Sequence, residues 1–290
     1  MMKHLNLLLV LAALLAPASS NLLAQSEERS VYVTVVDKDD KPVAGLSPSQ
    51  FVVREGGMAR EVLRAEPASE PAQIALLIDT SAAIEPYVGD MRRALQTFFK
   101  EVGGKHEIAI VGYGERPTVL VDYTRDPKRL ENSLGMIFQR QNSGTELMDA
   151  IVEASRGLQK RKAQRPVIVV FNTRGQEFGE RTHTTVIDEL RKYPVTLHAL
   201  MLTRRGAPST NEREQQEMEL TIADGTKLTG GRRDELLTTM ALGDRLRVVL
   251  DEINNQYKVT YARPKTLIPP DALDVTSKRP GVVVRARQIP

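Results

Sequence analysis

The sequence predicts an α/β protein built on a doubly wound, mostly parallel, Rossmann-like sheet that is flanked by helices. Short and nearly continuous apolar runs are typical of strands buried on both faces of a parallel sheet. Amphipathic helical patterns separate most of these runs, as a series of βαβ units requires. The 290 residues are 41% hydrophobic and 27% charged, which is enough apolar material for a sizeable core.

The α/β domain is expected over residues 72–263. Its predicted strands are 74–78, 108–111, 118–121, 167–171, 195–202 and 257–261. Its predicted helices are 85–102, 130–138, 146–159, 184–192 and 240–254. Ligands of such sheets bind outside the carboxyl ends of the strands, so the residues that directly follow each strand are the candidates for function.

The start of the chain is typical of a secretory signal peptide, which we place at residues 1–24. Lys3 precedes an apolar run over 5–16, and small residues suited to cleavage lie near Ala18 and Ala24. We therefore expect an exported protein, either periplasmic or secreted. No later segment approaches 18 consecutive apolar residues, so no transmembrane segment is expected in the mature chain.

Residues 28–66 predict a small β-rich extension in front of the α/β domain. Apolar side chains alternate over 31–36, and Gly56-Gly57 separates two arms of an expected hairpin. The C-terminal tail, residues 264–290, contains five prolines and a weakly alternating segment over 282–287. That segment predicts an edge strand.

Composition excludes several classes of function. The chain has no Cys, which rules out disulfides, thiolate metal sites, cysteine nucleophiles and a lipidated cysteine. Its 40 Lys and Arg residues nearly balance 37 Asp and Glu residues. The basic cluster at 160–165 stands alone and lacks interleaved aromatic residues, so no nucleic-acid partner is expected.

Oxygen-bearing side chains follow the first core strand. Asp79 and Ser81 come directly after strand 74–78 and should stand at the carboxyl edge of the sheet. A carboxylate and a hydroxyl are hard oxygen ligands of the kind that Mg²⁺ prefers. These residues are therefore candidates for a metal site.

The segment Asp79-Thr80-Ser81-Ala82-Ala83 resembles the first metal-site loop, Asp-x-Ser-x-Ser, of von Willebrand factor type A domains. Residues 143–150 resemble the Gly-Thr loop of that family, in which the threonine that corresponds to Thr145 is the next ligand. The resemblance extends over about 31–288 and is closest in pattern to a bacterial exported subgroup. It implies a site for Mg²⁺ or Mn²⁺ made by Asp79, Ser81 and Thr145.

Two departures from the family pattern weaken this implied site. Ala83 stands where the first loop has a second serine, and Asn172-Thr173-Arg174-Gly175 stands where the family has Thr-Asp-Gly. Arg174 thus replaces the carboxylate that completes the site, and a cation repels a second cation. Either the three remaining ligands still hold Mg²⁺ or Mn²⁺, or the site is degenerate and Arg174 pairs with Asp79 in place of the metal.

The resemblance favours a non-enzymatic, exported adhesion-type module. We expect it to contact a protein or cell-envelope component through the loops at the carboxyl edge, including the polar stretch 204–217, with weak or lost metal dependence. The alternative is a metal-assisted hydrolase at the same edge. Its general base would be Glu146, Asp149 or Glu177.

Overall fold

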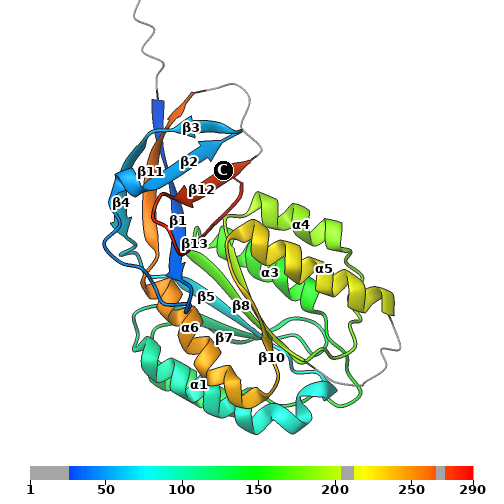
Figure 1. Ribbon diagram of the computed structural model, residues 1–290. Helices are drawn as coiled ribbons and strands as arrows, with labels where there is room; N and C mark the ends of the chain where they lie inside the picture. The colour runs from blue at the N-terminus through cyan, green and yellow to red at the C-terminus, as the bar shows by residue number, and fades with distance from the viewer. Residues whose placement is uncertain (1–25, 204–211, 266–271, 290) are drawn as a thin grey trace, which may run out of the picture.

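The computed structural model describes residues 26–203, 212–265 and 272–289, which form an α/β unit and a smaller β-unit (Figure 1). The predicted signal peptide lies outside the described residues. Within the described residues, no helix combines the length and the apolar character that a membrane crossing requires.

The α/β unit has a six-stranded sheet in the order β10-β9-β8-β5-β6-β7, in which only β7 runs antiparallel to its neighbour. The strands are β5 (Gln73–Ile78), β6 (Glu107–Gly112), β7 (Thr118–Thr124), β8 (Pro166–Asn172), β9 (Thr196–Leu202) and β10 (Arg233–Leu236). The helices are α1 (Val88–Val102), α2 (Pro127–Ser133), α3 (Leu147–Lys160), α4 (His183–Lys192), α5 (Glu212–Thr229) and α6 (Leu242–Asn254). The predicted doubly wound, mostly parallel sheet is confirmed.

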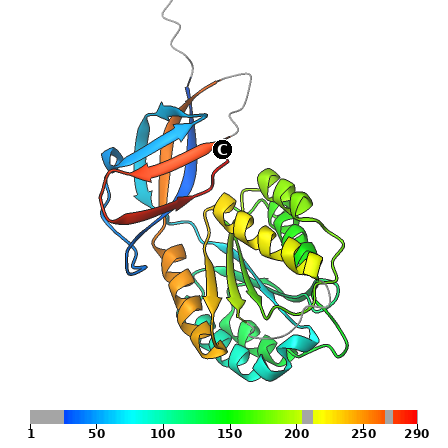
Figure 2. The same cartoon turned by 45° about the vertical axis from the view of Figure 1, so that its right-hand side comes forward.

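Helices cover both faces of this sheet (Figure 2). Alternate residues of β5 serve opposite faces: Leu76 packs in the cluster that contains the buried side of α1 and α6, and Leu77 packs in the cluster that contains α3 and α4. Because both faces are buried, the residues from Ile74 to Ile78 are all apolar, which explains the continuous apolar runs.

The β-unit consists of two sheets, with strand orders β13-β1-β11-β4 and β12-β2-β3. The strands are β1 (Ser26–Asp37), β2 (Phe51–Glu55), β3 (Met58–Arg60), β4 (Val62–Pro67), β11 (Tyr257–Pro264), β12 (Leu273–Ser277) and β13 (Val282–Ala286). The expected hairpin is present as β2 and β3, with Gly56 and Gly57 at positive φ between them.

The two ends of the chain build the β-unit together, which differs from the predicted boundaries at 28–66, 72–263 and 264–290. We expected residues 257–261 to end the α/β domain, but β11 pairs with β1 along eight residues, from Ser26–Pro264 to Val33–Tyr257. The tail strand β13 pairs with the other edge of β1. The physical reason is that β1, which is 12 residues long, needs hydrogen-bonding partners on both of its edges.

The structure also contains α5 and β10, which the sequence pattern did not indicate. Residues 212–217 of the expected polar loop form the first turns of α5, and residues 204–211 lie outside the described residues. The described residues also form four short 3₁₀ helices: Pro48–Gln50, Ala82–Tyr87, Leu134–Met136 and Thr239–Ala241.

Candidate functional site

Asp79 lies at the carboxyl end of β5 and is fully buried. Its Oδ1 accepts a hydrogen bond from the backbone N–H of Ser81 at 2.9 Å. Its Oδ2 accepts from the backbone N–H of Thr173 at 3.2 Å and from the Thr173 hydroxyl. Both carboxylate oxygens therefore have partners within the protein, and Thr173 occupies the side of Asp79 where we expected Arg174.

Ser81 and Thr145 lie next to the Gly175 backbone and are almost completely buried. A Cβ atom on Gly175 would stand 2.8 Å from Ser81 Oγ and 3.2 Å from Thr145 Cγ2. Ser81 Oγ accepts from the N–H of Ala83 at 3.3 Å and so caps the following 3₁₀ helix. The three predicted ligands do come together at one edge of the sheet, but the chain that follows β8 is packed over them.

The hydroxyl of Thr145 is hydrogen-bonded to the carboxylate of Glu177. The Thr145 hydroxyl donates to Glu177 Oε2 at 2.8 Å, the Leu147 N–H donates to the same oxygen at 3.1 Å, and the Gly179 N–H donates to Oε1 at 3.2 Å. Glu177 is 2% exposed, and this burial raises the pKa of its carboxyl to about 7.

Backbone hydrogen bonds fasten the two loops to each other. The Thr145 N–H donates to the Gln176 carbonyl at 2.7 Å, and the Phe178 N–H donates to the Thr145 carbonyl at 2.8 Å. These bonds form a short parallel bridge between Thr145 and Glu177. We name residues 173–179 the closing segment, because they cover the predicted metal ligands.

The donor set fits a divalent cation poorly. The oxygen atoms of Asp79, Ser81 and Thr145 already have hydrogen-bond partners, and none of these side chains reaches the surface. Nowhere in the described parts of the chain do three or more His, Asp or Glu residues gather in a way that could hold a metal ion. Magnesium favours several oxygen ligands in an open, near-octahedral arrangement.

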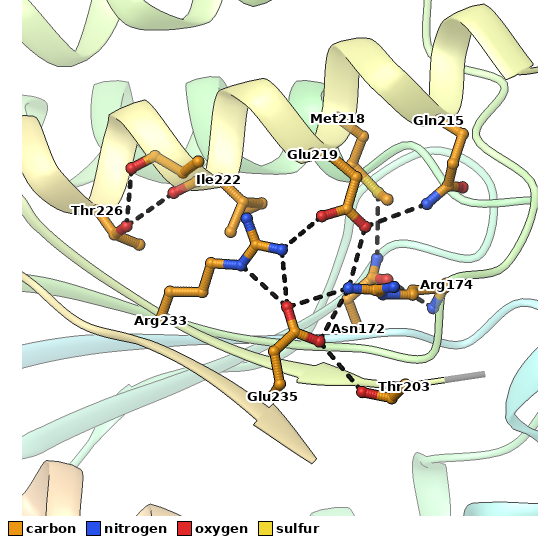
Figure 3. Close-up of polar contacts among 11 residues, drawn as sticks. Asn172, Arg174, Thr203, Gln215, Met218, Glu219, Ile222, Thr226, Arg233 and Glu235 are labelled. Carbon is orange, nitrogen blue, oxygen red and sulfur yellow. Dashed lines mark hydrogen bonds and ion pairs between the residues drawn. The ribbon is translucent and has the colours of Figure 1, made fainter. Parts of the chain in front are cut away.

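The predicted pairing of Arg174 with Asp79 is wrong. Arg174 has φ of 57°, and its guanidinium reaches Glu235 at 2.8 Å and Glu219 at 3.2 Å (Figure 3). Arg233 contacts the same two carboxylates, Glu219 at 2.6 Å and Glu235 at 2.7 Å. The left-handed turn directs Arg174 away from β5 and toward α5 and β10, where two carboxylates attract it.

These partners of Arg174 were missed because they lie on the two elements that the pattern did not indicate. Figure 3 shows Glu219 on α5 and Glu235 on β10, with Arg174 between them. The run 232–235, two arginines followed by two acids, was the available signal. Its two positive and two negative charges are adjacent in sequence and could pair with each other, so the run did not point to a partner elsewhere in the chain.

Two aromatic side chains, Phe138 and Phe178, are exposed on the loops that surround the closed site. We call the exposed surface of these loops the rim. Phe178 is 53% exposed and packs against Gly144, where an added Cβ would come within 2.1 Å of the ring. Phe138 is 55% exposed and precedes Arg140, whose N–H donates to the Thr80 carbonyl at 2.9 Å. The loops that cover the site thus present apolar surface to solvent.

The other proposed bases lie beside the closing segment. Asp149 pairs with Arg181 at 2.5 Å, and desolvation raises the pKa of Glu146. Glu177 has three donors around its carboxylate and little exposed surface. The sequence had named all three residues, but it gave no sign that Glu177 binds Thr145.

Solved structures and one family model are similar to parts of this chain. The von Willebrand factor type A from Catenulispora acidiphila is similar over 91% of this chain and 74% of its own, at 12% identity and a TM-score of 0.50. An aerotolerance-related membrane protein from Bacteroides fragilis, with multiple mutations to serines, is similar over 64% of this chain and 99% of its own, at 14% identity and a TM-score of 0.47. The vWF domain of the type V pili tip protein Mfa5 from Porphyromonas gingivalis is similar over 64% of this chain and 96% of its own, at 12% identity and a TM-score of 0.48.

No curated protein matches the sequence significantly. The family model described as von Willebrand factor type A domain matches residues 74–176, which run from β5 into the closing segment and include Asp79, Ser81 and Thr145. The sheet order, the Asp79 loop and the Gly-Thr loop at Thr145 agree with this match. The α/β unit of this chain therefore has the fold of a von Willebrand factor type A domain, and its residues 74–176 match the model of that family.

Proposed function

We propose that this chain is an exported, non-enzymatic binding module that docks a protein or cell-envelope partner at the carboxyl edge of its sheet without a divalent cation. The closing segment carries the proposal, because it engages the predicted ligands internally and presents Phe178 at the same place. The rim, rather than an ion, then makes the contact.

The energetics of the closed loops support a role without metal. An ion at Asp79 and Thr145 would have to displace the donors from Thr173 and the bond to Glu177. Each buried group left without a partner costs about 1–3 kcal/mol, and the entry of a metal ion would incur several of these costs at once. The same bonds keep the rim in a single arrangement before any partner arrives, which lowers the entropic cost of binding.

The chemistry of the rim supports a protein partner. Exposed aromatic side chains surrounded by charged groups are typical of protein-binding surfaces. Phe138 and Phe178 are each more than half exposed, and the rim also bears the ion pair of Arg140 with Glu115 at 3.0 Å. A complementary surface would bury the rings and meet the paired charges at its edge.

The geometry gives no particular support to the metal-assisted hydrolase. A general base must reach a proton on water or substrate. The carboxylate of Glu177 instead accepts hydrogen bonds from Thr145, Leu147 and Gly179, beneath the surface.

Metal dependence is tested by thermal melts of the purified protein in Mg²⁺, Mn²⁺ and EDTA. A ligand that binds only the native state raises the melting temperature, so equal midpoints in all three solutions are expected. An increase with Mg²⁺ or Mn²⁺ that Asp79→Ala abolishes would contradict the proposal and restore the metal site.

Docking is tested by immobilising the protein and capturing partners from the cell envelope of the source organism, in EDTA and in Mg²⁺. The same partner should be retained in both solutions and lost with the double variant Phe138→Ser/Phe178→Ser. Met58→Ser is the matched control, because Met58 is 60% exposed on the β-unit. Retention by the double variant would show that the rim is not the docking surface.

Export is tested by N-terminal sequencing of the protein recovered outside the cytoplasm of a producing bacterium. A mature chain that begins at Gln25 or at Ser19 is expected from the two cleavage sites. An exported chain that still begins at Met1 would contradict the signal peptide.

A further inference from the structure

A second polar site lies at the opposite, amino-terminal edge of the sheet, where the α/β unit meets the β-unit. A cavity of about 380 Å³ opens there between the starts of β8 and β9, the end of α4, strand β1 and the C-terminal tail. Its volume falls in the range of small-molecule sites. It shares no residue with the rim of the α/β unit.

The lining of this cavity is cationic. Six basic residues line it, and no Asp or Glu does: Arg29, Arg165, Arg191, Lys192, Arg263 and Arg287. Three of them form ion pairs with carboxylates outside the lining: Arg29 with Glu27 at 2.7 Å, Lys192 with Glu189 at 2.9 Å and Arg263 with Glu55 at 3.5 Å. Arg165, Arg191 and Arg287 form no such ion pair with a carboxylate of the described residues.

Arg287 is the central unbalanced cation. Its guanidinium donates to the carbonyls of Tyr193 at 2.9 Å and of Arg191 at 2.7 Å, at the C-terminal end of α4. No carboxylate of the described residues lies within 4.0 Å of it, and desolvation lowers its pKa to about 10. The end of a helix attracts a cation but carries no full counter-charge, so Arg287 is left without a carboxylate partner at this position.

Arg165 is the second cation of the cavity and is buried, at 2% exposure. It donates to the Glu70 carbonyl at 3.1 Å, to Gln256 Oε1 at 2.8 Å and to the Ile253 carbonyl, and its guanidinium lies 5.4 Å from the ring centre of Tyr32. All of these hydrogen-bond acceptors are neutral, and the carboxylate of Glu70, which acts on Arg165 electrostatically, is itself paired with Lys258. A buried charge with only neutral acceptors is costly, and an anion nearby would lower that cost.

Exposed Arg191 adds a third cation without a carboxylate partner in the described chain. Apolar and aromatic side chains complete the lining. They come from both units and include Val31, Tyr32, Pro194, Val195, Tyr261 and Leu273. A cavity with a cationic part and an apolar part suits a ligand that has both an anionic head and an apolar group.

We propose that this cavity binds an amphiphilic organic anion: a carboxylate or phosphate head held by Arg191 and Arg287, joined to an apolar group that packs between the two units. Guanidinium groups recognise both kinds of head, often through paired hydrogen bonds. Because both units line the cavity, such a ligand fixes the β-unit against the α/β unit.

The test is isothermal titration of the purified protein with octanoate, octyl phosphate and the neutral octyl glucoside, all below their micellar concentrations. Saturable binding of at least one anion is expected, with at least tenfold weaker binding of octyl glucoside. The two anions distinguish a carboxylate ligand from a phosphate ligand.

The variants Arg191→Gln and Arg287→Gln should each weaken anion binding at least fivefold, and Arg287→Lys should weaken it less than Arg287→Gln because it keeps the charge. Arg247→Gln is the matched control, since Arg247 is exposed on α6 and does not line the cavity. If Arg287→Gln does not fold, the Arg191→Gln variant still tests the proposal, because Arg191 is exposed.

Three results would overturn the proposal: no saturable binding of either anion, equal binding of octyl glucoside, or unchanged affinity in Arg191→Gln. None of these results affects docking at the carboxyl edge, which does not involve these residues.

Discussion

Charged side chains at the carboxyl edge of the sheet and at its amino edge have different kinds of partner. At the carboxyl edge, Asp79 and Glu177 accept several hydrogen bonds each from neighbouring loops, and Arg174 lies between two carboxylates. At the amino edge, the buried Arg165 and the half-buried Arg287 donate hydrogen bonds to neutral acceptors only. The family motif marks the first edge, but the unbalanced charge lies at the second.

This difference suggests that the charged groups of the carboxyl edge serve stability and those of the amino edge serve ligand binding. Groups whose partners are supplied by the protein itself contribute to the free energy of unfolding, and their removal leaves buried donors without acceptors. Groups that lack a counter-charge cost stability and become useful when a ligand supplies it. Substitutions at the two edges should therefore change different measurements.

Asp79→Ala should have the largest effect on stability. It leaves the N–H groups of Ser81 and Thr173 and the Thr173 hydroxyl without their acceptor, and so should lower the free energy of unfolding by about 4 kcal/mol. Urea unfolding in EDTA and in Mg²⁺ measures this loss. Equal losses are expected in both solutions; a loss confined to Mg²⁺ would mean that Asp79 serves a metal after all.

Glu177 should make stability depend on pH. Its carboxyl keeps a proton up to about pH 7 when folded and releases it near pH 4.5 when unfolded, so the folded state binds more protons between these values. The free energy of unfolding should therefore fall by about 3 kcal/mol as pH rises from 4.5 to 7.

Glu177→Gln removes this titration, so the fall between pH 4.5 and 7 should be smaller in the variant when urea unfolding is measured across that range. Glu153→Gln is the control, because Glu153 lies exposed on the nearby helix α3. An identical slope in the unmodified protein and Glu177→Gln would show that Glu177 does not hold its proton in the closed site.

Arg174→Ala should have a smaller effect, because Arg233 continues to pair with Glu219 and Glu235. The Arg174 side chain is 24% exposed, and its loss should cost about 1 kcal/mol at low salt and less at high salt. Urea unfolding at two salt concentrations checks this, with the more exposed Arg247→Ala as control. If the loss were independent of salt, packing rather than charge would explain the position of Arg174.

The local pattern of apolar residues in the sequence was enough to predict most strands of the sheet and the edge at which the candidate site lies. Strand β5 has continuous apolar residues, and the parallel arrangement brings Asp79, Ser81 and Thr145 to one edge. Helix α5 was missed because its buried side includes Thr221, Gly225, Thr226 and Thr229. Small polar residues of this kind leave little apolar periodicity, and the threonine hydroxyls are satisfied by carbonyls one turn earlier.

The partners within the site could not be predicted for a related reason. Arg174 pairs with Glu219 and Glu235, and Thr145 pairs with Glu177. These pairs join residues 32 to 61 positions apart through backbone turns that the pattern does not encode. The pairing of β1 with β11 joins positions more than 200 residues apart. Such long-range choices depend on the complete fold rather than on any local spacing.

Arg191→Gln should have the smallest effect on stability and so gives the sharpest test of the contrast between the edges. Arg191 is exposed in the last turn of α4, where losing a cation gives up a few tenths of a kcal/mol with the helix dipole. Removing its repulsion from Arg287 and Lys192 offsets that loss, so the free energy of unfolding should change by less than about 0.5 kcal/mol. Urea unfolding without added anion measures this. A loss near that of Asp79→Ala would place Arg191 in an internal network, and the amino edge would then hold the fold together as the carboxyl edge does.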